Sequence, residues 1–325
     1  MPAPPSSISN LQSKVWNGSI SLEIRLAASD CRTYNESEPY LVQYPRLSYL
    51  NFLLHRLHAF FSSSLIDPAV SSYDAWLSFD GVPLKWHYPL GLLYDLFSGA
   101  EPAYLERNQM DEPPAASPTT VEATTLPVPI PWRLTIHYTD FPGDQLIQLD
   151  AGGRAMLDSF INSVKEADFI RNGTARTVMS LSKDDSDKLW HAVQTNDRLL
   201  FNTVNNKLLN PPGLEIRHIP LKIYLPTSAS TTELTTVSEE TQSVGHIRVV
   251  QTLVPKQIGP SRTPQTLGTA LNSVLPTIFP SRRNPLLAQP VLHGAVTPMS
   301  ANLEDLGKAC AYLDGFLHIA VVMLG

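Results

Sequence analysis

The same order of predicted elements occurs twice in this chain, once in each outer third. The order is strand, strand, helix, strand, short helix, strand. A chain that repeats this order must build two mixed sheets, each packed against one main helix. This is the β-grasp, or ubiquitin-like, arrangement. The sequence therefore predicts an α+β protein in which two ubiquitin-like domains flank a helix-rich domain.

Alternating apolar residues predict the strands, and apolar residues at helical spacing predict the helices. In the first copy we expect strands over 20–26, 39–44, 76–79 and 132–138, and helices over 50–61, capped by Ser48, and 89–97. In the second copy we expect strands over 219–225, 247–254, 290–295 and 316–323, and helices over 267–278 and 300–311. The last strand is apolar on both faces, which is typical of the middle of a sheet. Pro276 is expected to kink or shorten its helix.

Proline marks the boundaries between these parts. The chain has 28 prolines among 325 residues, but none lies between Pro142 and Pro211. This proline-free centre predicts one helix over 156–167 and a second that is capped by Ser182, runs to 208 and stops at 210–213. The predicted parts are a disordered lead over 1–10, a first ubiquitin-like domain over 11–142 with a Pro-rich insertion over 99–130, a helix-rich domain over 143–212, and a second ubiquitin-like domain over 213–325 with a Ser/Thr-rich loop over 227–243.

The chain carries no recognisable catalytic, cofactor or metal motif. Glycine-rich phosphate loops and the H-E-x-x-H and G-x-S-x-G patterns are absent from the sequence. His55 and His58 share a helix face but need a third ligand to hold a metal. Cys31 and Cys310 lie too far apart in the sequence to form a disulfide framework, which fits a reducing compartment. No base that would make either cysteine a nucleophile is implied. We therefore expect a cytoplasmic protein that is not an enzyme and has no cofactor and no metal site.

The charge distribution is uneven. The net charge of -6 argues against a protein built to bind nucleic acid. Between Glu240 and Glu304 there is no acidic residue, and the same stretch holds five basic ones: Arg248, Lys256, Arg262, Arg282 and Arg283. A basic residue near an anionic membrane contributes about 1 kcal/mol of attraction. The stretch is therefore a candidate for peripheral membrane contact, and the alternative is an ordinary solvated surface whose charges do not cluster.

Seven segments resemble one known family. They are 38–50, 81–96, 131–138, 160–168, 190–208, 219–224 and 316–319, and the most specific is the run PLKWHYPLGLL at 83–93. Together they resemble the autophagy-related protein 5 family over nearly the whole chain, except for 1–10, 99–130 and 227–243. Trp86, within that run, is expected to pack on the first ubiquitin-like core or its interface with the middle domain. The alternative is a partner surface formed by Trp86, His87 and Tyr88.

The resemblance implies a function. It implies that one lysine is conjugated covalently to the ubiquitin-like modifier autophagy-related protein 12 by the conjugating enzymes of the autophagy system. It also implies binding of the coiled-coil autophagy-related protein 16. The complex would act like an E3 ligase for lipidation of autophagy-related protein 8, as a peripheral membrane component of the preautophagosomal structure. The family's acceptor lysine lies in a V-K-E-A-D segment, which matches Val164–Asp168 and so points to Lys165.

The residues around Lys165 are compatible with that role. Val164 belongs to the apolar face of the predicted helix, and the next residue is rotated by about 100°. Lys165 is therefore expected at the flank, within reach of solvent, with Asp158 and Asp168 on roughly the same side. Two alternatives stay open: a ubiquitin-like adaptor that is never conjugated, and a hydrolase that uses Cys31 or Cys310.

Overall fold

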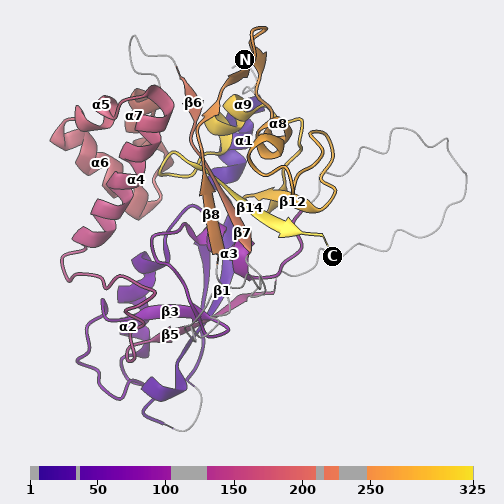
Figure 1. Ribbon diagram of the computed structural model, residues 1–325. Helices are drawn as coiled ribbons and strands as arrows, with labels where there is room; N and C mark the ends of the chain where they lie inside the picture. The colour runs from indigo at the N-terminus through magenta and orange to yellow at the C-terminus, as the bar shows by residue number, and fades with distance from the viewer. Residues whose placement is uncertain (1–6, 34–36, 104–129, 210–215, 227–246, 325) are drawn as a thin grey trace, which may run out of the picture.

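The computed structural model describes residues 7–33, 37–103, 130–209, 216–226 and 247–324. The predicted insertion lies outside the described residues over 104–129, as do the Ser/Thr-rich loop 227–243 and the predicted helix stop at 210–213. Figure 1 shows the first sheet in the lower part of the molecule, the second sheet in the centre and a bundle of helices at the upper left.

The first sheet has five strands in the order β2-β1-β5-β3-β4, and β1 and β5 run parallel in its centre. The strands are β1 (Ser19–Leu26), β2 (Tyr40–Pro45), β3 (Trp76–Phe79), β4 (Val82–Pro83) and β5 (Trp132–His137). Their apolar side chains share a core with the 3-10 turn η2 (Leu50–Leu53), α2 (Leu54–Phe61) and α3 (Leu90–Phe97). A second 3-10 turn, η1 (Ala28–Asp30), follows β1. The predicted cap by Ser48 is wrong, because the helical stretch begins as η2 after Tyr49 without a side-chain cap.

The second sheet repeats this topology in the order β13-β12-β14-β7-β8, again with its first and last strands parallel in the centre. Its elements are β7 (Leu221–Pro226), β8 (Ile247–Gln251), β12 (Ala288–Leu292), β13 (Ala295–Val296), β14 (Leu317–Met323), α8 (Leu267–Val274) and α9 (Leu303–Cys310). Two short ladders pair β6 (His218–Ile219) with β9 (Val254–Pro255) and β10 (Gln257–Ile258) with β11 (Thr263–Pro264). The central place of the last strand and the early end of α8 before Pro276 are confirmed.

The helical bundle is divided into more helices than predicted. The bundle contains α4 (Arg154–Asn172), α5 (Arg176–Met179), α6 (Lys183–Thr195) and α7 (Arg198–Leu209). The Ser182 hydroxyl accepts a hydrogen bond from the Asp185 amide at 3.1 Å, which confirms that cap. A single helix over 182–208 is wrong, because Asn196 adopts a left-handed conformation with φ 54° and separates α6 from α7.

The chain's first described residues are also helical. Helix α1 spans Ser7–Trp16, so the prediction of a disordered lead is wrong for residues 7–10. Ile8, Val15 and Trp16 pack against the larger of the two main cores, and the Gln12 amide donates to the Lys308 carbonyl of α9 at 2.8 Å. These contacts stabilise a helix that is too short to form alone in water.

The bundle and the second ubiquitin-like domain share one continuous core. The same buried cluster contains Phe160 and Val204 from the bundle and Ile223 and Leu317 from the second sheet. The two parts are therefore expected to fold together. Of the helices in the described part of the chain, none has the length and apolarity needed to span a bilayer.

Candidate functional site

Helix α4 carries the candidate acceptor lysine and has well-defined ends. The Asp150 carboxylate accepts hydrogen bonds from the amides of Arg154 at 3.1 Å and Ala155 at 2.7 Å, which satisfies free donors of the first turn. These backbone bonds lower the pKa of Asp150. At the other end Gly173 has φ 74°, and its amide donates to the Phe169 carbonyl at 2.7 Å. Helices commonly end at a glycine in the left-handed conformation, because glycine has no Cβ and adopts that conformation without a steric penalty.

Both ubiquitin-like domains hold α4, one at each half of the helix. In its first half, Met156 belongs to the core of the first domain. In its second half, Ala167 and Ile170 form a small apolar cluster with Phe316 of the second domain. The buried Arg171 guanidinium also donates to the Gly315 carbonyl at 3.1 Å. The helix is therefore a strut between the two domains.

Lys165 lies on the solvent-facing flank of this strut. Val164 is buried, as the helical pattern predicts, and Lys165 is half-buried. Among the described residues none forms an ion pair with the Lys165 ammonium. The long side chain of Lys165 is thus not tied to a carboxylate.

The prediction that Asp168 lies on roughly the same solvent-accessible side of the helix as Lys165 is wrong. Asp168 is only 1% exposed, and its carboxylate accepts hydrogen bonds from the Asn172 amide at 2.7 Å and the Val178 backbone at 3.1 Å. Asp168 therefore anchors α5 to the end of α4. Asp158 is exposed, as the pattern predicts.

Glu166 connects the helix to the second sheet. Its carboxylate accepts hydrogen bonds at 2.9 Å from Lys222 of β7 and, through the other oxygen, at 2.9 Å from Gln251 of β8. Partial burial opposes ionisation, but these two bonds keep the pKa of Glu166 below its ordinary value. Sequence reasoning did not single out Glu166. Its place beside Lys165 was the only available signal, since its partners lie 56 and 85 residues away.

The five basic residues of the acid-free stretch are spread along the second domain. Arg248 is exposed on β8 and pairs in register with Leu225, whereas Lys256 follows β9, whose Val254 pairs with Ile219. At a strand rise of about 3.3 Å the stretch 219–225 separates these two places by roughly 20 Å. The structure therefore does not bring Arg248 together with Lys256. The remaining three residues, Arg262, Arg282 and Arg283, are exposed, and the Arg282 guanidinium donates to the Asn272 side chain at 2.9 Å.

An open cleft lies where all three parts of the chain meet α1. It holds about 540 Å³ of empty volume between α1, α7 and the segment that joins α9 to β14. Trp16, Phe201 and Leu313 supply apolar lining, and Arg198 and Lys308 supply positive charge. No sequence motif pointed to this cleft, because its lining comes from four separate segments.

The cysteines and histidines in the described part of the chain do not form a catalytic or metal site. Cys310 is buried, and burial raises the pKa of its thiol to about 11, which is the opposite of an activated nucleophile. His55 contacts the side chains of Ser72 and Tyr73, each at 2.9 Å. Within the described ranges no group of three or more His, Cys, Asp or Glu residues is arranged to hold a metal ion.

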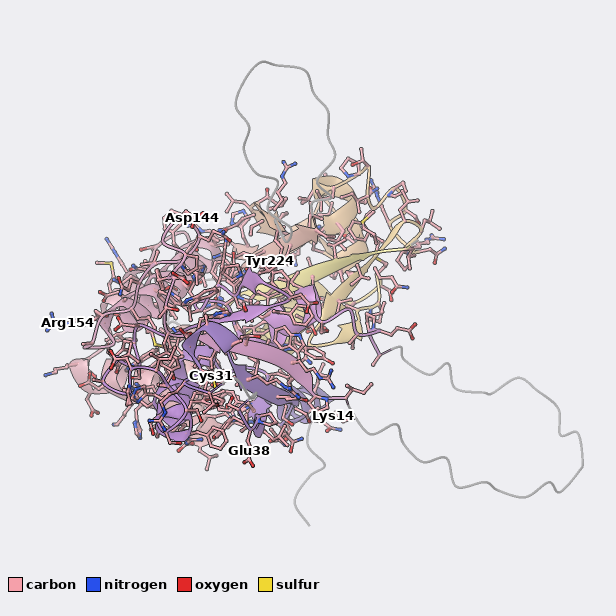
Figure 2. The ribbon with its side chains drawn as sticks, turned by 90° about the horizontal axis from the view of Figure 1, so that it is seen from below. Lys14, Cys31, Glu38, Asp144, Arg154 and Tyr224 are labelled. Atoms are coloured by element: carbon pink, nitrogen blue, oxygen red, sulfur yellow. The ribbon has the colours of Figure 1, made fainter. Side chains whose placement is uncertain are left out.

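Trp86 takes the packing role that its pattern predicts. It packs against the first ubiquitin-like core, and its indole N–H donates to the Ile147 carbonyl at 2.7 Å. In Figure 2, Arg154, at the start of α4, lies at the outer edge of the molecule, whereas Tyr224 lies in its interior. Tyr224 is 1% exposed, and the centres of its ring and the Tyr88 ring lie 5.4 Å apart across the interface of the two ubiquitin-like domains.

The topology and the shared strut define a class: two ubiquitin-like domains joined through a helical bundle. Three family models match the chain, namely the UblA domain of autophagy protein ATG5 over residues 15–138, its alpha-helical bundle region over 153–211, and its UblB domain over 218–321. The chain belongs to the autophagy protein 5 family and takes part in autophagy.

Individual relatives match over nearly their full length. Autophagy protein 5 of Phaeosphaeria nodorum is 56% identical over 317 residues, which cover 98% of each chain. Autophagy protein 5 of Aspergillus fumigatus is 47% identical over 333 residues, which cover 98% of this chain and 97% of that one. The crystal structure of Kluyveromyces marxianus Atg5 matches with a TM-score of 0.68 at 21% identity, over 96% of this chain and 98% of the other.

Proposed function

We propose that Lys165 is the isopeptide acceptor for the ubiquitin-like modifier autophagy-related protein 12. The observation that carries the proposal is the position of Lys165 on the solvent-facing flank of a helix that both ubiquitin-like domains hold. Four other lysines take part in ion pairs: Lys188, Lys207, Lys222 and Lys308. An amine held by a carboxylate must give up that contact before it can react.

The chemistry assigns different tasks to the two proteins in the reaction. The Lys165 amine attacks the thioester carbonyl that joins the modifier's C-terminus to a cysteine of a conjugating enzyme. A C–N amide bond forms, the C–S bond breaks, the thiolate leaves and the amine loses a proton. The conjugating enzyme must supply the activated carbonyl, and this chain supplies a positioned amine. In this account the chain is a non-catalytic component.

The conjugate would work as a scaffold in a larger assembly. We propose that it binds the coiled-coil autophagy-related protein 16 and, with it, promotes lipidation of autophagy-related protein 8 in an E3-like complex. The cleft beside α1 suits a helical partner with apolar and acidic residues, because Trp16, Phe201 and Leu313 supply apolar lining and Arg198 supplies positive charge. The Arg198→Glu variant is expected to weaken binding of autophagy-related protein 16 in calorimetry, whereas Lys183→Glu, on an exposed face of α6, is expected to bind normally.

Membrane contact is a separate part of the proposal. The protein would act in the cytoplasm and touch the preautophagosomal membrane peripherally through exposed basic residues of the second domain. Liposome flotation with anionic lipid tests this with the double variant Arg282→Glu/Arg283→Glu. The matched control is Lys14→Glu/Lys183→Glu, which changes the net charge equally at exposed positions elsewhere. Equal flotation of the two variants would count against a role for Arg282 and Arg283.

The acceptor assignment is tested by reconstituted conjugation with purified modifier, activating enzyme and conjugating enzyme. The wild-type chain and the control Lys183→Arg are expected to gain the mass of the modifier, and Lys165→Arg is expected to remain unshifted. A shifted product from Lys165→Arg would refute the assignment. A wild-type chain that is never shifted would favour the alternative of a non-conjugated adaptor.

A further inference from the structure

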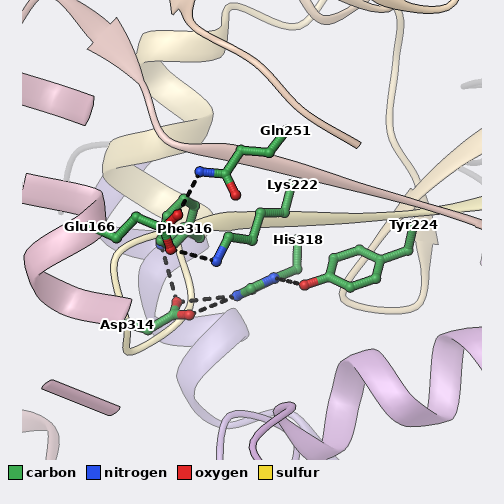
Figure 3. A network of polar contacts seen from close by, with 7 residues as sticks. All are labelled: Glu166, Lys222, Tyr224, Gln251, Asp314, Phe316 and His318. Atoms are coloured by element: carbon green, nitrogen blue, oxygen red, sulfur yellow. Dashed lines mark hydrogen bonds and ion pairs between the residues drawn. The ribbon is translucent and has the colours of Figure 1, made fainter. Parts of the chain in front are cut away.

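Three elements meet at the Glu166 carboxylate, the residue next to the proposed acceptor. Glu166 lies on α4, Lys222 on β7 and Gln251 on β8, and each of the two partners donates to a different carboxylate oxygen at 2.9 Å. Figure 3 shows the two partners reaching the carboxylate from the neighbouring strands. We call these three residues the Glu166 clamp.

The Lys222 side chain of the clamp is partly buried against the Phe316 ring. The Lys222 side chain is only 15% exposed, and its ammonium lies 4.0 Å from the centre of the Phe316 ring. Phe316 in turn packs against Ala167 and Ile170 of α4. The Lys222 ammonium therefore contacts Glu166 of α4 and Phe316, which packs against the same helix.

A second layer of contacts keeps Phe316 in place. The Asp314 carboxylate accepts a hydrogen bond from the Phe316 backbone at 3.1 Å and lies 3.0 Å from the His318 ring nitrogen. The other ring nitrogen of His318 lies 2.8 Å from the Tyr224 hydroxyl, as Figure 3 shows. These buried contacts fix Phe316, the residue over whose ring the Lys222 ammonium lies.

The position of Glu166 gives the clamp a consequence for its neighbour. Consecutive residues on a helix are separated by about 100° and 1.5 Å, so fixing one side chain fixes the direction in which the next one leaves the helix. We propose that the Glu166 clamp is a positioning device that sets the rotation of α4 and so presents the Lys165 amine to the incoming thioester. This inference rests on the proposed acceptor role of Lys165.

Glu166 itself is poorly placed to act as the base. Both of its oxygens already accept hydrogen bonds, from Lys222 and from Gln251. The Lys222 ammonium also favours the ionised carboxylate, which makes it a weak proton acceptor. Its contribution would therefore come through geometry. Misplacing a reacting group by about 1 Å can reduce a rate by roughly 100-fold.

The test measures single-turnover conjugation of the full-length chain at several concentrations of the loaded conjugating enzyme. Here kcat is the rate constant at saturating enzyme, and KM is the enzyme concentration that gives half of that rate. Glu166→Ala removes the clamp, and we expect kcat to fall about tenfold with KM within twofold of wild type. Glu166→Gln keeps a side chain that can bond to both partners, and we expect a rate within about threefold of wild type. The matched control is Asp184→Ala, which removes an exposed ion pair with Lys188 from the same bundle and should leave the rate unchanged.

Three results would overturn the inference: Glu166→Ala as fast as wild type, Glu166→Gln as slow as Glu166→Ala, or a loss confined to KM. Gln251→Leu provides a milder variant at an exposed position, should Glu166→Ala fail to fold, and a rate equal to wild type would also count against the clamp. Lys165→Arg in the same assay separates the two proposals. If it still conjugates, the acceptor assignment fails; if it does not and the clamp variants are normal, only the clamp fails.

Discussion

A buried ion pair within the first ubiquitin-like domain lies at its contact with the second, and its removal gives the most informative stability experiment. Arg46, just after β2, pairs with Asp95 of α3, and their side chains are 11% and 3% exposed. The second oxygen of Asp95 accepts a hydrogen bond at 2.9 Å from the amide of Gly294, in the turn between β12 and β13. Arg46 also donates to the Gly91 carbonyl at 3.2 Å. One carboxylate therefore serves both domains.

The expected magnitude follows from what each substitution leaves behind. Asp95→Ala strands a buried guanidinium, and breaking such a pair costs about 3–5 kcal/mol of the free energy of unfolding. Burial raises the pKa of Asp95 despite the attraction of Arg46, so the folded state disfavours the ionised carboxylate. The stability from this group is therefore greatest at acid pH and falls as the pH rises through its pKa values. Replacing both partners by apolar residues, as in Arg46→Met/Asp95→Leu, should cost less than Asp95→Ala, about 1–3 kcal/mol at pH 7, because only the Gly294 amide then loses its acceptor.

Urea denaturation of the full-length chain, followed by far-UV circular dichroism, measures these differences. The exposed pair of Asp184 and Lys188 supplies the control, and Asp184→Ala should change the free energy of unfolding by less than about 1 kcal/mol. The reasoning would be refuted by an Asp95→Ala variant no less stable than Asp184→Ala. It would equally be refuted by a double variant as unstable as the single one.

Three further changes test individual elements of the fold. Ser182→Ala removes the cap of α6 and should lower the free energy of unfolding by about 1 kcal/mol, measured by urea denaturation. Gly268→Ala places a Cβ 2.0 Å from the Arg282 carbonyl oxygen. The variant should therefore lose about 1–3 kcal/mol or more of the free energy of unfolding, although alanine is the better helix former. An unchanged melting temperature would contradict the close packing of α8. Burial raises the pKa of Asp314, but the nearby His318 outweighs this effect, so the pKa of Asp314 is lowered. Asp314→Asn removes this ionisable group. The wild type should be more stable than this variant above pH ~3.9, with the difference shrinking as the pH falls through the lowered pKa.

Local patterns predicted most of the strands and helices. The alternation over Ile20–Leu26 corresponds to β1, and the apolar run at 316–323 corresponds to the central strand β14. These patterns succeed because each is set by whether one or both faces of a strand are buried. The hairpin of β12 and β13 was missed. Its turn needs positive φ at both His293 and Gly294, and histidine is not the usual residue for such a turn.

Features that depend on distant contacts were not predictable. Helix α1 forms against α9 at the other end of the chain, so no pattern within residues 1–10 could reveal it. Asn196 ends α6 although the apolar spacing continues into α7, because asparagine tolerates the left-handed conformation. Within the candidate site, helical spacing placed Lys165 at the flank. The inward turn of Asp168 and the partners of Glu166 depend on contacts with α5 and the second sheet.

The central claim is that one lysine of this chain carries the modifier. The most direct measurement is the mass of the endogenous protein, followed by peptide sequencing of its branched fragment. We predict a mass increased by that of the modifier and a branch at Lys165. An unshifted mass in all conditions, or a branch at any other lysine, would contradict the claim.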